Sequence, residues 1–111
     1  MSSLSFGRGD LVTVSLSGDF GKPRLALIIQ SDAFSSLPSV TVLPLTSDLY
    51  DAQNIRVTIQ PSEANGLELP SQIMIDRAAT LRRDKVGKYM GRISTEMLDE
   101  VHERLVRFLG K

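Results

Sequence analysis

The chain has 111 residues, 41% of them hydrophobic and 23% charged, so we expect a single globular domain over residues 1–111, with a flexible N-terminus over residues 1–6. The formal net charge is zero, which argues against a general polyanion binder held by overall charge. The chain has no cysteine and one histidine, which excludes a disulfide framework and a thiolate metal site, so we expect no metal and no cofactor.

The N-terminal segment predicts neither export nor membrane insertion. Residues 1–7 lack the apolar core of a signal peptide, and no later apolar run approaches the roughly 20 residues of a membrane span. We therefore expect a cytoplasmic protein with no membrane association. Gly7 and Gly9 open the domain, Asp10–Leu16 alternates apolar and polar residues as a half-buried strand does, and the turn-rich residues 17–23 predict a loop.

Two near-continuous apolar segments follow and predict strands buried in a small sheet or barrel. They span Arg24–Ser31 and Ser39–Thr46, with a loop over residues 33–39 between them and Pro44 marking an edge or a bulge. Arg24 therefore begins one apolar strand, and Thr46 ends the next. A guanidinium at such a place keeps its head exposed or meets an anion, and phosphate is one such anion.

The second half of the chain predicts further strands and a terminal helix. We expect strands over Asn54–Gln60 and Ser71–Thr80, a helical turn within residues 82–88, and a short last strand over residues 89–93. Ser94 or Thr95 caps a helix that runs to about Leu109, with Gly110 as its stop. Its apolar stripe predicts core packing and comprises Met97, Val101, Leu105 and Phe108, joined by Leu98 and Leu109. Five or six short strands and one amphipathic helix predict a mainly β protein in which a helix seals a small, strongly bent sheet or barrel.

The usual catalytic signatures are missing from the sequence, which has no Cys–His pair, G-x-S-x-G motif, phosphate-binding glycine loop or metal-ligand spacing. We interpret His102, beside the helical stripe, as a surface or partly buried histidine. An enzyme of this composition must therefore work without histidine, cysteine or a tight metal site. RNA phosphodiester cleavage can do so, because the ribose 2′-hydroxyl is the nucleophile and the protein need only orient it, stabilise the phosphorane and move protons.

Arg24 and Thr46 suit this chemistry, because a guanidinium fork matches two phosphate oxygens and a hydroxyl can bond a third. The residues alone leave other interpretations open. Arg24 can form a surface ion pair at its strand end, and Thr46 can begin a Thr-Ser-Asp turn. The segment from Arg77 to Arg92 holds six basic residues against one acid, Asp84, and is typical of a solvated surface.

The sequence resembles the MazF/PemK family of toxin endoribonucleases from Gly7 to Gly110, with the matching segments in the same order. Residues 8–16 (RGDLVTVSL) are similar to the family's R-G-[DE]-hydrophobic first strand, and residues 24–32 (RLALIIQSD) to its second strand, normally Arg-Pro followed by apolar residues. Residues 40–46 (VTVLPLT) are similar to the third strand and its threonine, and residues 91–110 (GRISTEMLDEVHERLVRFLG) to the closing strand and helix.

The resemblance implies a small SH3-like β-barrel with a C-terminal helix, of the type shared by MazF, PemK and CcdB, and a homodimer. Family members cleave single-stranded RNA at short sequences without metal and leave a 2′,3′-cyclic phosphate. A cognate antitoxin neutralises them by blocking the site with an extended segment. The family's catalytic arginine falls on Arg24, expected to stabilise the phosphorane, and its threonine on Thr46, expected to hold a phosphate oxygen or orient the attacking group. The RNA contacts that we expect are Lys22, Gln30, Ser31, Asp76 and Arg77.

Three departures from the family pattern limit what carries over. Leu25 follows Arg24 where the family prefers proline, and Pro23 precedes it instead. The loop over residues 17–23 is shorter than usual and lacks the His/Glu/Gln stretch of many members, so base preference does not carry over. Members that use the fifth-strand aspartate have an arginine where this chain has Met74, so we interpret Asp76 as an RNA contact or structural acceptor rather than a general base.

Two other functions compete with RNA cleavage. A gyrase poison of the CcdB type shares the fold but acts through C-terminal residues, typically a tryptophan before Gly-Ile, whereas this chain has no tryptophan and ends Phe108-Leu109-Gly110-Lys111. A non-catalytic barrel that only binds a partner is the third possibility. The retained Arg24 and Thr46 disfavour it, and the short loop and Met74 favour it slightly.

Overall fold

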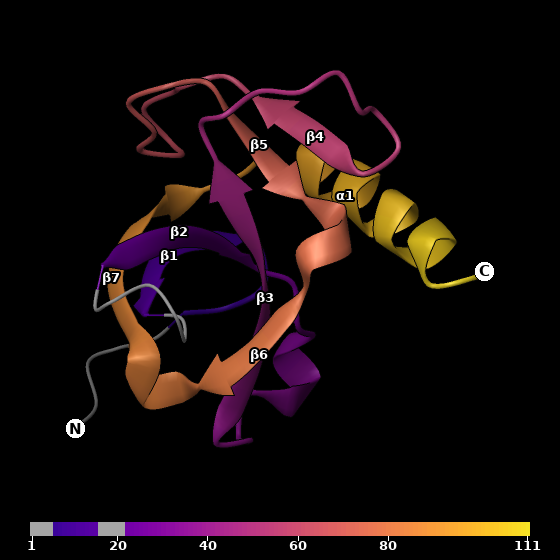
Figure 1. Ribbon diagram of the computed structural model, residues 1–111. Helices are drawn as coiled ribbons and strands as arrows, with labels where there is room; N and C mark the ends of the chain where they lie inside the picture. The colour runs from indigo at the N-terminus through magenta and orange to yellow at the C-terminus, as the bar shows by residue number, and fades with distance from the viewer. Residues whose placement is uncertain (1–5, 16–21) are drawn as a thin grey trace.

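Three consecutive antiparallel strands form the centre of the fold in the computed structural model, which describes residues 6–15 and 22–111. They are β1 (Asp10–Ser15), β2 (Pro23–Ile28) and β3 (Ser39–Thr46), and Figure 1 shows them packed side by side. The outer edge of β1 pairs with β7 (Val86–Arg92). The outer edge of β3 pairs first with β6 (Ala79–Arg82) and then with β5 (Ser71–Met74), which in turn pairs with β4 (Arg56–Ile59).

These pairings make one bent antiparallel sheet rather than a closed cylinder. The strand order is β4-β5-β3-β2-β1-β7, with β6 beside β3, and within the described residues no pairing joins β4 to β7. The predicted mainly β fold with a C-terminal helix is confirmed. The expected barrel takes the form of a curled sheet whose two ends stay apart.

The two faces of the central strands enclose two separate apolar clusters, which explains why β2 and β3 have near-continuous apolar sequences. Alternate side chains of a strand point to opposite faces of its sheet, so Leu27 joins the cluster beneath the helix while Ala26 and Ile28 join the other. Leu43 and Val42 divide in the same way on β3. The second cluster is closed by Val86 of β7, Leu81 of β6 and Phe6.

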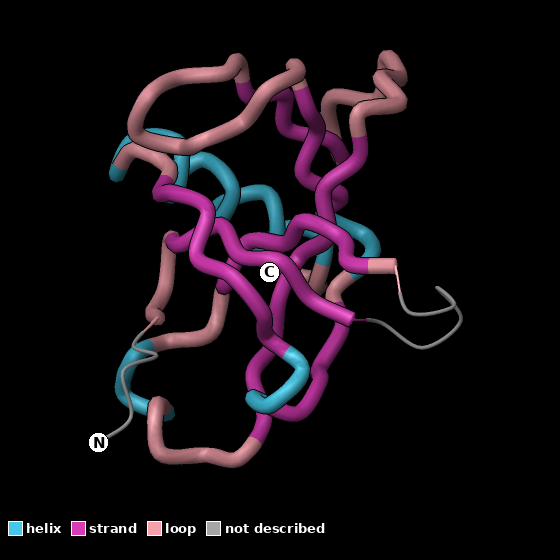
Figure 2. Tube along the Cα trace, turned by 90° about the vertical axis from the view of Figure 1, so that its left-hand side faces the viewer, coloured by secondary structure: helices cyan, strands magenta, loops and turns pink. Residues whose placement is uncertain are grey.

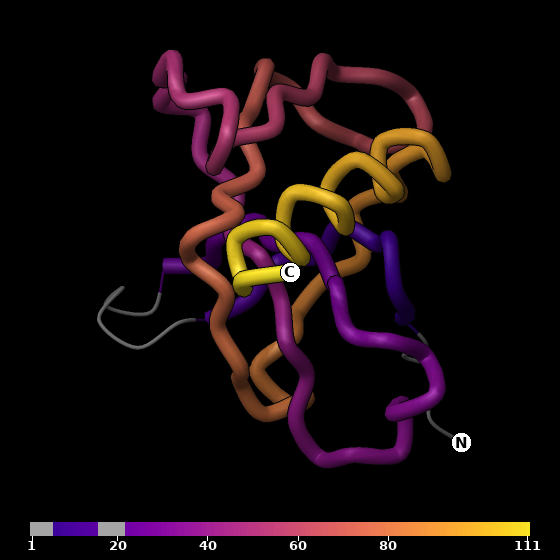
Figure 3. Tube along the Cα trace, turned by 90° about the vertical axis from the view of Figure 1, so that its right-hand side faces the viewer, coloured from indigo at the N-terminus to yellow at the C-terminus, as the bar shows by residue number. Residues whose placement is uncertain are grey.

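Helix α1 (Thr95–Phe108) lies across the face of the first cluster, as Figure 3 shows. Ser94 is its N-cap, because the Ser94 hydroxyl accepts a hydrogen bond from the Met97 N–H at 3.1 Å. Gly110, with φ of +102°, follows the last turn as predicted. The described residues include no helix that is both long and apolar enough to cross a membrane.

The predicted helical stripe is confirmed only in part. Val101 is fully buried, and Met97, Leu98 and Leu105 pack against the same cluster. Phe108 and Leu109 were expected in the core, but 51% and 72% of their surfaces are exposed. The expectation was wrong because the helix extends past the edge of the sheet face that it covers, so its last turn has no strand beneath it.

The predicted fifth strand over residues 71–80 is broken in two. β5 ends at Met74, the short 3-10 helix η2 (Ile75–Arg77) follows, and β6 begins at Ala79. Ile75 is buried beneath α1 and its N–H donates to Ile55 O at 2.8 Å, which turns the chain away from β3. Pro44 lies on β3 between the residues that pair with β6 and those that pair with β5.

The remaining expectations concern short segments. The predicted helical turn is η3 (Arg83–Lys85), and the last strand begins at Val86, earlier than expected. Figure 2 shows η3 at the same lower end of the molecule as η1 (Asp32–Phe34), where Arg83 donates to Leu37 O at 2.6 Å. His102 is exposed, as expected.

Some expectations fall on residues outside the described part of the chain. They are the flexible N-terminus over residues 1–5, the last residue of the first predicted strand, and most of the loop over residues 17–23. Phe6 is described, and the Arg83 guanidinium lies 5.5 Å from its ring centroid.

Candidate active site

Arg24 and Thr46 lie on neighbouring strands, just beyond the last paired residues of β2 and β3. The pairing of β2 with β3 ends at Ala26 and Pro44, and Arg24 and Thr46 lie two residues further along their strands. Both residues line the same pocket, which makes it the candidate place for a phosphate.

The Thr46 hydroxyl takes part in a local turn and can still donate a hydrogen bond. Its oxygen accepts a hydrogen bond from the Asp48 N–H at 3.0 Å, which is the turn that Thr-Ser-Asp predicted. A hydroxyl has two acceptor lone pairs and one proton, so this bond leaves the proton available to an anionic oxygen. The turn interpretation and the functional interpretation of Thr46 are therefore compatible.

Buried Gln72 holds the loop that follows Thr46. Gln72 pairs with Thr46 across β5 and β3, its Oε1 accepts from the Tyr50 N–H at 3.0 Å, and its Nε2 donates to Tyr50 O at 2.8 Å. The Arg56 guanidinium then stacks 4.9 Å from the Tyr50 ring centroid. These contacts fix the direction in which the chain leaves the site.

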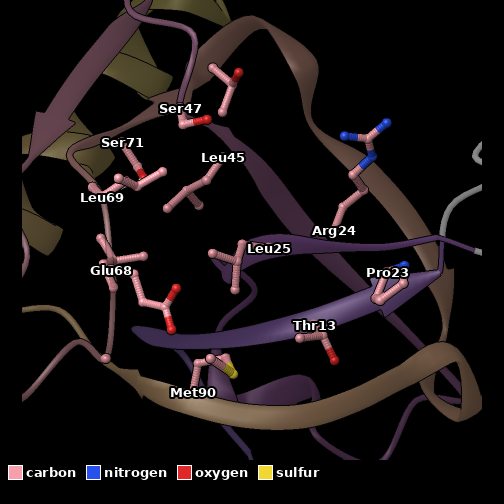
Figure 4. Close-up of a pocket in the computed structure, with 13 residues that line it drawn as sticks. Thr13, Pro23, Arg24, Leu25, Leu45, Ser47, Glu68, Leu69, Ser71 and Met90 are labelled. Atoms are coloured by element: carbon pink, nitrogen blue, oxygen red, sulfur yellow. Dashed lines mark hydrogen bonds between the residues drawn. The ribbon is translucent and has the colours of Figure 1, made fainter.

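The pocket beside Arg24 has a volume of about 460 Å³ and continues from the strand ends towards β7. Figure 4 shows Arg24 at one side of it and Glu68 reaching in from the other side. The apolar side chains that line it come from four segments of the chain and are Pro23, Leu25, Leu45, Leu67, Leu69 and Met90. The arrangement is an apolar hollow with a cation at one end and a carboxylate at the other.

The break in the predicted fifth strand opens a second hollow on the other side of Arg24 and Thr46. This hollow has a volume of about 370 Å³, and Met74, Arg77 and Ala79 line it together with Arg24 and Thr46. Arg77 is therefore brought to the site by η2, in a position that a continuous strand over residues 71–80 would not have produced. Its side chain is 65% exposed and carries a second positive charge next to Arg24.

Asp76 and Lys22 lie beside these site residues in the chain. The Asp76 Oδ2 is 3.9 Å from Arg77 Nε, and its Oδ1 is buried and has no hydrogen-bond partner within the described part of the chain. Lys22 is exposed immediately before β2. Asp76 lines neither of the two hollows.

Gln30 and Ser31 are not brought together with Arg24. They follow β2 at its far end, and six residues of strand span about 20 Å. The Gln30 side chain donates to Phe34 O and Ser39 O and accepts from the Thr41 N–H, and the Ser31 hydroxyl accepts from the Ala33 N–H to cap η1. Both side chains hold the turn between β2 and β3.

Sequence reasoning missed the wall of the pocket that residues 66–71 supply. Glu68 and Ser71 belong to it, and Thr13 and Met90 face it from β1 and β7. No local motif marks these residues, because a single glutamate in a Pro- and Gly-containing loop is typical of any solvated loop. Within residues 6–15 and 22–111 no three His, Asp or Glu side chains gather as metal ligands would.

Solved structures share this fold over nearly the whole chain. An endoribonuclease in complex with its cognate antitoxin, from a mycobacterial species, superposes with a TM-score of 0.81 at 21% identity, covering 96% of each chain. A MazE–MazF complex from Deinococcus radiodurans gives a TM-score of 0.78 at 22% identity, covering 97% of this chain and 98% of the other. The fold is therefore that of the MazF toxins.

Sequence comparison then defines the family. The chain is 39% identical over 104 residues to a probable endoribonuclease MazF of Mycolicibacterium smegmatis, covering 93% of this chain and 95% of the relative. The family model of PemK-like, MazF-like toxins matches residues 7–109. The chain belongs to this family of toxins of type II toxin–antitoxin systems.

Proposed function

We propose that this protein is a toxin endoribonuclease that cleaves single-stranded RNA at selected sequences without a metal ion and is neutralised by a cognate antitoxin. The relative named a probable endoribonuclease and the fold shared with a toxin–antitoxin complex support the class of activity. The observation that carries the proposal for this chain is the Arg24–Thr46 pair at one pocket. We also propose that the protein acts in the cytoplasm as a homodimer and forms one toxin domain over residues 1–111.

The proposed reaction is an internal transfer within the RNA. The ribose 2′-oxygen bonds to phosphorus and loses its proton, the bond from phosphorus to the 5′-oxygen breaks, and that oxygen takes up a proton. A 2′,3′-cyclic phosphate and a free 5′-hydroxyl result. Arg24 stabilises the charge on the phosphorane with its guanidinium fork and donates a hydrogen bond to the leaving 5′-oxygen. Thr46 donates its hydroxyl proton to a phosphate oxygen and so helps to align the attacking group.

The proposed RNA contacts divide into two sets. Lys22 and Arg77 lie near Arg24 and are suited to flanking phosphates, and Asp76 stands beside Arg77. Gln30 and Ser31 are engaged with backbone groups at the far end of β2. RNA contact by Gln30 and Ser31 therefore requires a strand long enough to reach that end, and we assign the first set the larger part of binding.

The test is incubation of the purified protein with a long RNA in excess EDTA, followed by mapping of the cut ends. The Arg24→Ala variant is compared in parallel with Arg107→Ala, a matched control that removes an arginine 71% exposed on α1. We expect discrete cuts with 2′,3′-cyclic phosphates from the wild type and the control. We expect a loss of at least about a hundredfold for Arg24→Ala.

Two outcomes would contradict the proposal. A folded wild-type protein that leaves RNA intact but binds antitoxin is a binding-only member of the family. A large fall in the melting temperature of Arg24→Ala would make Arg24 a structural residue. The gyrase alternative finds no support in the comparisons, because the family model that matches describes PemK-like and MazF-like toxins.

A further inference from the structure

The pocket beside Arg24 carries opposite charges at its two ends. Arg24 stands at one end with Thr46, and Glu68 enters from the other. In the view of Figure 4, Leu25 lies between the two charged side chains, and Met90 lies next to Glu68. No ion pair to Glu68 is found among the described residues, in contrast to Asp10, Asp84, Glu100 and Glu103, each of which pairs with an arginine.

The loop that presents Glu68 is built rigidly. Buried Asn65 accepts hydrogen bonds at its Oδ1 from the Ser62 N–H at 2.9 Å and the Leu67 N–H at 3.0 Å, and its Nδ2 donates to Gln60 O at 2.9 Å. Gly66 has φ of +69° and allows the loop to lie directly against the backbone of β7. Glu68 is two residues beyond this anchor, so the fold fixes its backbone.

The size and chemistry of the pocket fit a nucleobase. A hollow of about 460 Å³, lined by apolar side chains together with threonine and serine hydroxyls, is in the usual range for small-ligand sites. A negative carboxylate repels phosphate, so a nucleotide can enter in one orientation, with its phosphate at Arg24 and its base towards Glu68. Proteins that recognise single-stranded RNA commonly read the Watson–Crick edge of an unpaired base in this way.

Among the four bases, guanine suits a carboxylate best. Its Watson–Crick edge presents two adjacent donors, N1–H and N2–H, which can bond both oxygens of one carboxylate. Adenine and cytosine present one amino donor beside an acceptor nitrogen, and uracil presents one N–H between two carbonyl oxygens. An acceptor facing a carboxylate is repelled, so these three bases each lose a bond and gain a repulsion.

We infer that Glu68 is a specificity residue that selects guanine in one of the two nucleotides flanking the phosphate held by Arg24 and Thr46. This inference rests on the proposed function, since it places the scissile phosphate at that pair. Glu68 bonds the base and takes no part in the proton transfers.

The first experiment measures binding without cleavage. The probes are short single-stranded uridine oligonucleotides with a 2′-deoxyribose at the central nucleotide, which removes the nucleophile. Each base in turn is set on either side of the central phosphate, and Kd is measured for the wild type, Glu68→Gln and Glu63→Gln. The Glu63 variant is the matched control, because it makes the same change on an exposed residue of the same loop outside the pocket.

We expect guanine at one of the two positions to bind wild type and Glu63→Gln about tenfold or more tightly than the other bases. The amide of Glu68→Gln can accept only one of the two guanine bonds and turns a donor towards the other, so this preference should largely disappear. Equal binding of all four bases, a guanine preference retained in Glu68→Gln, or no binding of any oligonucleotide would overturn the inference.

The second experiment uses the all-ribose oligonucleotides and measures cleavage. A guanine preference in binding that depends on Glu68, without any cleavage, would contradict the proposed function and leave the base assignment standing. Cleavage by wild type and Glu68→Gln with the same base preference would overturn the assignment and leave the proposed function standing.

Discussion

At the residue scale, the site depends on the coincidence of two strand ends. Arg24 lies at the start of β2 and Thr46 ends β3, and both line one pocket although 22 positions separate them in the chain. The Thr46 oxygen accepts the hydrogen bond of the turn, and the hydroxyl proton takes no part in that bond. Substitution can therefore separate the structural role of Thr46 from its proposed catalytic role.

Replacing Thr46 by valine keeps its shape and removes the hydroxyl, whereas Thr46→Ser keeps the hydroxyl. We expect Thr46→Val to lower the single-turnover cleavage rate by about a hundredfold or more, as loss of a transition-state donor does. The lost bond to the Asp48 N–H costs about 1 kcal/mol of unfolding free energy. Cleavage rates and thermal unfolding of both variants check this. If valine and serine cleave equally well, the hydroxyl has no catalytic role.

At the element scale, two features support the site, the capped helix α1 and the loop of residues 60–70, and both contribute side chains to the first apolar cluster. The helix covers the cluster that contains Leu27 and Leu43. The loop meets β7 so closely that a Cβ on Gly91 would lie 2.4 Å from the Asn65 carbonyl carbon and 2.5 Å from Ala64 O. Each feature can therefore be tested at a single residue.

The Ser94→Ala variant tests the helix cap. Loss of the bond to the Met97 N–H should lower the free energy of unfolding by about 1 kcal/mol, whereas Ser94→Asp should retain most of it because aspartate also accepts from that N–H. Chemical denaturation measures the difference, with Ser36→Ala in an exposed loop as control. Equal stability of the wild type and Ser94→Ala would contradict the assignment of the cap.

The Gly91→Ala variant tests the contact between the loop and β7. The added methyl group has to displace the backbone at Asn65, so we expect a loss of about 1–3 kcal/mol in stability. The wall that carries Glu68 should move with that backbone, so the guanine preference should weaken as well. Denaturant unfolding and the oligonucleotide series measure the two effects. If Gly91→Ala keeps the wild-type stability and the wild-type guanine preference, the loop moves aside at no cost in free energy.

At the scale of the whole molecule, the zero net charge makes RNA binding depend on a few local cations. Lys22, Arg24 and Arg77 are the basic residues at or beside the two hollows. Within the basic segment, Arg82 pairs with Asp84 at 2.5 Å and Arg92 with Asp10 at 2.5 Å, and Arg77 lies 3.9 Å from Asp76. Because Lys22, Arg24 and Arg77 lie at or beside the two hollows, we expect these three cations to release counterions when a single strand binds there.

Three phosphate contacts predict a slope of about −2 for the logarithm of the binding constant against the logarithm of salt concentration, at about −0.7 for each contact on a single strand. Arg77→Gln should make the slope shallower by about 0.7, and Lys85→Gln, on η3, should leave it unchanged. Titrations of an uncleavable oligonucleotide over a range of salt concentrations test this. A much steeper slope would mean that RNA follows the whole basic segment.

The sequence by itself determined most of the elements and indicated the candidate pair of the site. Apolar runs in β2 and β3 reflect burial on two faces, Ser94 and Gly110 mark the helix ends, and Arg24 and Thr46 stand where the resemblance puts them. These features are local or periodic, so they can be read from neighbouring residues.

The tertiary structure alone decided which distant segments share the pocket. It broke the predicted fifth strand at η2, which brought Arg77 to the site, and it left Gln30 and Ser31 at the far end of β2. It also brought Glu68 into the pocket that Arg24 lines, through the close contact of its loop with β7. The physical reason is that register, strand bending and backbone contact depend on pairs of residues far apart in the chain, which no local periodicity encodes.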